Sequence, residues 1–62
     1  MIIAWTMTLT YEGARGALTL KAAVTRIVCH DGLLQWWQAG ESVVAPSQHH
    51  VRLSDVVTLD LH

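Results

Sequence analysis

The chain of 62 residues contains one cysteine, one proline and no phenylalanine, and charged residues make up only 15% of it. The single cysteine, Cys29, excludes an internal disulfide and fits a reducing compartment. No run of apolar residues approaches the ~20 that a membrane helix needs. Residues 1–10 lack the basic start of a signal peptide, and threonine recurs at alternate positions among them. We therefore expect a cytoplasmic protein. A protein from a phage or another mobile element would have the same features.

The charges are nearly balanced, with four Lys and Arg against five Asp and Glu and a formal net charge of −1. Such a balance lacks the basic excess that neutralises phosphates in nucleic-acid binders. The length predicts a single domain over residues 1–62. A domain this short buries only about 60% of the surface of its unfolded chain, so it commonly needs a metal or a second copy for support. Since 52% of the residues are hydrophobic, we expect part of the surface to meet a partner.

Apolar residues alternate with polar ones from Ile3 to Tyr11, and threonines occupy most of the even positions. This two-residue period predicts a half-buried strand. Residues 12–16 contain two glycines and predict a loop with a bulge or a longer turn. Residues 17–30 also predict a strand, in which the apolar phase slips at Thr25-Arg26 as a bulge would require. A short helix within 17–29 is the alternative, because some apolar positions there fit a helical spacing.

The stretch from Cys29 to Ala45 contains a strong hairpin signal, Asp31-Gly32. Residues 33–38 after it are predicted to form the middle strand of a three-stranded meander. A turn at 39–42 then leads into a short strand at 43–45, which ends at Pro46 because proline cannot donate to a ladder. Residues 47–50 are predicted to be polar loop, residues 53–56 a single turn and residues 57–61 the last strand.

These elements predict an all-β fold: a small antiparallel meander of four to six short strands that forms a curled sheet or an open barrel. The sequence contains no internal repeat. The order of turns and strands from Val24 to Leu61 resembles a generic pattern of small bacterial and phage domains. The residues that match are turn and core residues, so the resemblance implies no function.

Four residues have the chemistry of metal ligands, and they occur as two adjacent pairs: Cys29, His30, His49 and His50. Adjacent residues on a strand point to opposite faces, so each pair offers one ligand to a given site. We expect no metal and no cofactor, with Cys29 a small buried hydrophobe and the histidines exposed. A cysteine nucleophile beside His30 or His49 would need a cleft for which a small β domain has little room, so we expect no enzymatic activity.

Two of the three tryptophans, Trp36 and Trp37, are adjacent and must face opposite sides of a strand. One is expected to pack in the core with Trp5, Leu9 and Leu34, and the sequence leaves open which one. The other is a candidate contact for a second chain. The alternative is that its own loop shields it. The predicted interface residues are Trp36, Trp37, Leu33 and Trp5.

The sequence thus predicts a non-enzymatic interaction or assembly domain that forms a homo-oligomer, a dimer or higher, through an apolar sheet face or edge. Its other protein partners are not indicated. Two further classes are open. A small nucleic-acid-binding barrel would bring the four basic side chains, Arg15, Lys21, Arg26 and Arg52, to one face. A metal- or thiol-dependent site would bring Cys29 together with the histidines.

Overall fold

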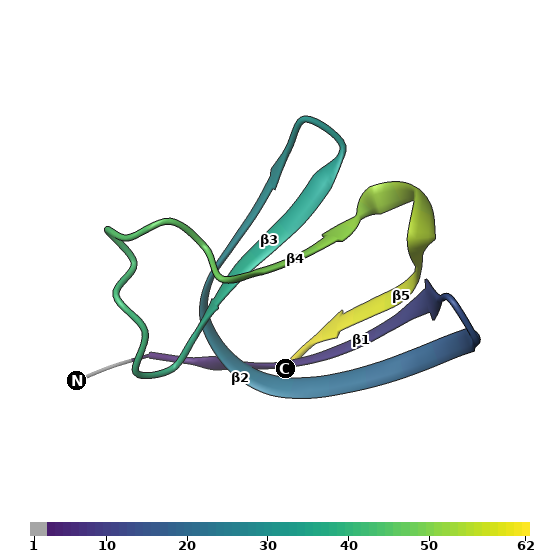
Figure 1. Ribbon diagram of the computed structural model, residues 1–62. Coiled ribbons are helices and arrows are strands. Elements are labelled where there is room, and N and C mark those ends of the chain that lie inside the picture. The colour runs from purple at the N-terminus through teal and green to yellow at the C-terminus, as the bar shows by residue number, and fades with distance from the viewer. Residues whose placement is uncertain (1–2) are drawn as a thin grey trace.

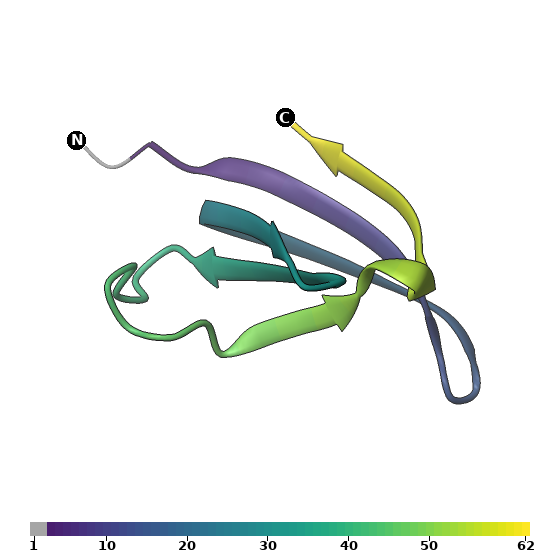
Figure 2. The same cartoon turned by 90° about the horizontal axis from the view of Figure 1, so that it is seen from above.

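A computed structural model describes residues 3–62, and Met1 and Ile2 of the N-terminal segment lie outside these described residues. Five antiparallel strands form one open, curled sheet in the order β4-β3-β2-β1-β5 (Figures 1 and 2). The strands are β1 (Trp5–Gly13), β2 (Gly16–His30), β3 (Leu33–Gln38), β4 (His49–Arg52) and β5 (Val56–Leu61). A 3-10 turn, η1 (Leu53–Asp55), joins β4 to β5. The all-β prediction is confirmed.

Strand β1 has the alternation that its sequence predicts, because Met7 and Leu9 are completely buried while the threonines at positions 6, 8 and 10 are half-buried. The loop after it is tighter than predicted. Gly13 pairs with Gly16, so only residues 14–15 connect the strands, and the expected bulge or longer turn is wrong. A φ of 116° at Gly16, which side chains rarely tolerate, permits this close reversal.

Strand β2 is one continuous strand, so the alternative of a helix within 17–29 is wrong. Its first part pairs with β1 and its second part with β3, and the register shifts between Val24 and Arg26. This shift confirms the bulge predicted at Thr25-Arg26. Because a bulge bends its strand, β2 curls through both halves of the sheet, as Figure 1 shows. Val24 lies where the halves meet and is completely buried.

Strand β3 follows a two-residue turn in which both Asp31 (φ 51°) and Gly32 (φ 74°) have positive φ, as a type I′ hairpin requires. It lies between β2 and β4, so its prediction as a middle strand is confirmed. The third strand of the meander is not residues 43–45, which form a turn, but His49–Arg52. The predictions of a strand at 43–45 and of a polar loop reaching His50 are therefore wrong. Side-chain contacts hold residues 39–48 as a loop, as described below.

The predicted turn before the last strand is confirmed as η1, and β5 occupies almost the predicted range. Strand β5 pairs with β1 rather than with β4, although β4 precedes it in the chain. Strands β4 and β5 are consequently the two ends of the strand order, as Figure 2 shows. Within residues 3–62, no helix is long and apolar enough to cross a membrane.

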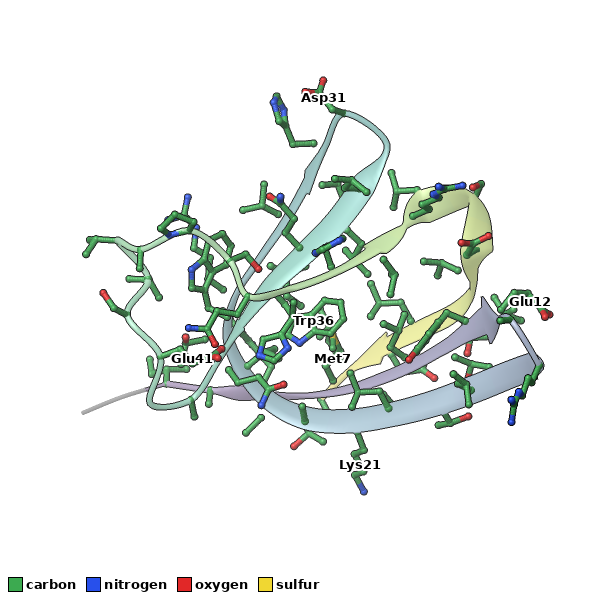
Figure 3. The ribbon with its side chains drawn as sticks, in the orientation of Figure 1. Met7, Glu12, Lys21, Asp31, Trp36 and Glu41 are labelled. Atoms are coloured by element: carbon green, nitrogen blue, oxygen red, sulfur yellow. The ribbon has the colours of Figure 1, made fainter. Side chains whose placement is uncertain are left out.

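The core lies inside the curl of the sheet, where side chains from β1, β2 and β3 meet. Figure 3 shows Met7 and Trp36 pointing into this space and Lys21 pointing away from it. The buried cluster is Met7, Leu9, Val24, Leu34 and Trp36. Half-buried apolar residues such as Tyr11 and Val51 surround it. Leu34 and Trp36 contribute one face of β3 to this cluster.

Candidate interaction surfaces

Trp36 is the tryptophan that fills the core, with 3% of its surface exposed. Its ring stacks on the imidazole of His49, its cross-strand neighbour on β4, with 5.6 Å between ring centroids and 11° between planes. Its indole Nε1 is buried without a hydrogen-bond partner among the described residues. In this conformation Trp36 shapes the inside of the domain and presents almost no surface to a second chain.

Trp37 faces the opposite side of β3 and is also covered, with 8% of its surface exposed. Its indole Nε1 donates a hydrogen bond to the carbonyl oxygen of Ala45 (2.9 Å). The guanidinium of Arg26 lies 4.9 Å from the ring centroid, a cation–π distance, and donates to the carbonyl oxygen of Val43 (3.2 Å). The loop of residues 39–48 thus shields Trp37, which is the alternative that the sequence left open.

Glu41 fastens the same loop to the sheet with both carboxylate oxygens. Oε1 accepts the backbone N–H of Gln38 (2.6 Å), and Oε2 lies 3.0 Å from His49 Nε2. The Gln38 N–H is the main cause that lowers the pKa of Glu41 below its ordinary value of 4.5; desolvation opposes it, and the contact with His49 lowers the pKa further. Ser47 adds a hydrogen bond to the carbonyl oxygen of Trp36 (2.8 Å). These anchors hold residues 43–45 in the loop.

Two open hollows flank this loop. One of 310 Å³ lies beside Trp37, and another of 390 Å³ lies beside Thr25 and Val43. Gly40, Glu41 and Ser42 line both. Glu41 is the ionisable side chain among the lining residues, and its carboxylate is already engaged by Gln38 and His49. Its contacts give Glu41 a structural role in the loop.

The residues with metal-ligand chemistry are dispersed. His30 lies 3.1 Å from its neighbour Asp31, whereas His49 contacts Glu41. Within the described part of the chain, no three His, Cys, Asp or Glu side chains gather as a metal would require. Cys29 is exposed, so the expectation that it is buried is wrong. The reason is visible in Figure 1, where the β2–β3 hairpin extends away from the rest of the sheet.

The four basic side chains are spread over the β1–β2 turn, β2 and β4. Arg15 is in the β1–β2 turn, Lys21 is in the middle of β2, and Arg52 ends β4. Arg26 follows the bulge and is already engaged by Trp37 and Val43. The contacts of Arg26 therefore give it a role within the fold.

An exposed apolar surface lies where β1 meets β5, and we call Trp5, Leu59 and Leu61 the β1–β5 strip. Their exposed fractions are 45%, 38% and 48%. Leu59 is opposite the buried Leu9, and Leu61 is opposite the buried Met7, so both leucines are on the core side of the sheet. Trp5 precedes Met7 by two residues and shares that side. The strip therefore extends the core face of the sheet out to solvent.

Of the four predicted interface residues, the structure places only Trp5 in this strip. Leu33 is half-buried at the β2–β3 hairpin, opposite Arg52. Sequence reasoning did not single out Leu59 and Leu61. The alternation of Val57, Leu59 and Leu61 was visible, but the pairing of β5 with β1, which gives these residues their position, joins opposite ends of the chain.

These features define the class of the chain as a small all-β domain with an open sheet and an apolar strip beside one edge. Comparison with known protein families, with curated proteins and with solved structures finds no match.

Proposed function

We propose that the chain is a non-enzymatic interaction domain that assembles with copies of itself. The observation that carries this proposal is the β1–β5 strip, in which each of three large apolar side chains is exposed by more than a third. Exposing apolar surface costs free energy of about 25 cal/mol for each Å². Covering the strip with a second apolar surface recovers part of that free energy, which offsets the entropic cost of association.

Among the predicted interface residues, Trp5 is suited to direct contact. Tryptophan supplies much of the binding energy in interfaces because it is large and has few rotatable bonds. Trp36 and Trp37 are not part of this strip, since the first fills the core and the second is covered by the 39–48 loop. Leu33 begins β3 and lies outside the β1–β5 strip.

The measurement that tests this function is sedimentation velocity of the full chain from low micromolar to near-millimolar concentration. We expect the weight-average mass to rise with concentration. Trp5→Lys should weaken association, because it places a charge in the strip. Val44→Lys is the matched control, because Val44 is 92% exposed in the 39–48 loop. A wild-type chain that stays a folded monomer throughout would contradict the proposal.

A further inference from the structure

The two outer strands of the sheet differ in how well they resist pairing with another strand. Strand β4 is short and contains His49, His50 and Arg52. Short strands and charged side chains are the usual protection of a sheet edge. Strand β5 is longer and contains a single acidic residue, Asp60, among exposed apolar residues. Strand β5 is therefore the less protected of the two.

The free backbone groups of β5 belong to the residues of the apolar strip. His62 and Thr6 exchange two backbone hydrogen bonds, each of 3.0 Å, so the N–H and C=O of His62 face β1. These directions alternate along an antiparallel strand. The N–H and C=O of Leu61 and Leu59 consequently face away from β1, at the open edge. The edge thus offers hydrogen-bonding groups and apolar side chains at the same positions.

We propose that β5 pairs antiparallel with β5 of a second copy, with Leu59 opposite Leu59 of that copy. This inference rests on the proposed function and names its partner and its register. In a two-fold symmetric pair, one residue meets itself and its neighbours meet in reciprocal pairs. Centring on Leu59 places Asp60 opposite Thr58 and Leu61 opposite Val57, the residue that the register shift between β5 and β1 leaves without a partner on β1. In this register apolar residues of one copy lie opposite apolar residues of the other, and no two like charges lie opposite each other.

The other registers are less favourable. A centre at Asp60 opposes the two Asp60 carboxylates, which is destabilising. A centre at Thr58 places Leu61 opposite Asp55, outside β5. Registers that place a residue opposite its sequence neighbour mix the two faces of the strand, because side chains alternate with a period of two. Leu59 is therefore the centre that satisfies both the charges and the apolar face.

A charge exchange at position 59 tests this register. Leu59→Lys and Leu59→Glu should each raise the dissociation constant of the homodimer by at least about tenfold, because like charges meet at the symmetry axis. An equimolar mixture of the two variants should restore a dimer, since Lys then faces Glu. The readout is sedimentation velocity, with circular dichroism to confirm that each variant is folded. Val44→Lys and Val44→Glu are the matched control pair.

A cysteine version tests the same geometry if the charged variants do not fold. In a Cys29→Ser background, Leu59→Cys should form an intermolecular disulfide under mild oxidation, because directly opposite residues lie within disulfide reach. Thr58→Cys should not, because Thr58 is opposite Asp60 in the proposed register. Equal cross-linking of the two variants would overturn the register.

The outcomes separate this inference from the proposed function. A monomeric wild-type chain contradicts both. A wild-type dimer that persists in Leu59→Lys and Leu59→Glu supports self-association but overturns the β5 pairing. A wild-type dimer that is lost in both variants and restored in the mixture supports both.

Discussion

Glu41 shows how one side chain determines the path of a long connection. Its carboxylate binds the Gln38 N–H at the end of β3 and contacts His49 at the start of β4. The two strands that the loop connects are thus joined through one residue within it. His49 in turn stacks on Trp36, so the loop anchor reaches the core.

The lowered pKa of Glu41 predicts an acid-sensitive stability. Because folding favours its carboxylate form, the stabilisation is fully present above the ordinary pKa of 4.5 and is lost as the pH falls through the lower folded value. We expect Glu41→Gln to be less stable than the wild type near neutral pH and to lose less stability between about pH 5.5 and about pH 3. The measurement is the urea midpoint at each pH.

Glu12→Gln is the matched control for this effect. Glu12 is exposed near the β1–β2 turn, where Figure 3 shows it away from the core. This variant should keep the pH dependence of the wild type. An identical pH dependence in Glu41→Gln and the wild type would show that Glu41 does not stabilise the loop through its charge.

Among the elements, the two tight hairpins depend on glycine to different degrees. Gly32 has a φ of 74°, close to the left-handed region that asparagine also adopts, whereas Gly16 has a φ of 116°, beyond that region. A Cβ atom at either position would meet nothing within 4 Å. The cost of a substitution there is therefore conformational strain and not a steric clash with neighbours.

We expect Gly16→Ala to destabilise the chain by roughly 2 kcal/mol and Gly32→Ala by roughly 1 kcal/mol. Gly32→Asn should cost less than Gly32→Ala, because asparagine tolerates the left-handed conformation. Denaturant unfolding followed by tryptophan fluorescence gives the three values. The same loss from both alanine variants would mean that φ at these turns does not determine their stability.

Local patterns predicted most of the strands, and they failed where contacts between distant residues decide the structure. The alternation in β1, the slip of phase in β2 and the Asp31-Gly32 turn each have a cause within a few residues. The loop at 39–48 does not. Val43 and Val44 favour a strand by composition, but Glu41, Trp37 and Arg26 fasten this segment as a loop.

The prediction of interface residues was likewise limited by contacts between distant residues. Opposite faces for Trp36 and Trp37 followed from strand geometry alone, and the structure has this arrangement. Whether Trp37 was exposed to a second chain depended on the path of the 39–48 loop, which the sequence did not reveal. The exposure of Leu59 and Leu61 similarly depends on a pairing between β1 and β5 that only the folded chain displays.

At the scale of the whole molecule, self-association predicts that thermal stability depends on protein concentration. When the native state is fully dimeric, a hundredfold rise in concentration adds about 1.4 kcal/mol per chain, which raises Tm by roughly 5–10 °C for a domain of this size. Differential scanning calorimetry over that range measures the shift. Leu59→Lys should show a Tm that is nearly independent of concentration, and a wild-type Tm equally constant would argue against assembly.

The pairing of β5 with β1 also has a consequence for folding kinetics. Met7 meets Leu61 across nearly the whole described chain, and such distant contacts form slowly because loop closure must precede them. Until β5 arrives, β1 exposes its own row of unpaired backbone groups. The β5 segment of another molecule has the same sequence and fits that row equally well. We therefore expect the docking of β5 on β1 to be the step of folding at which two chains can exchange this strand.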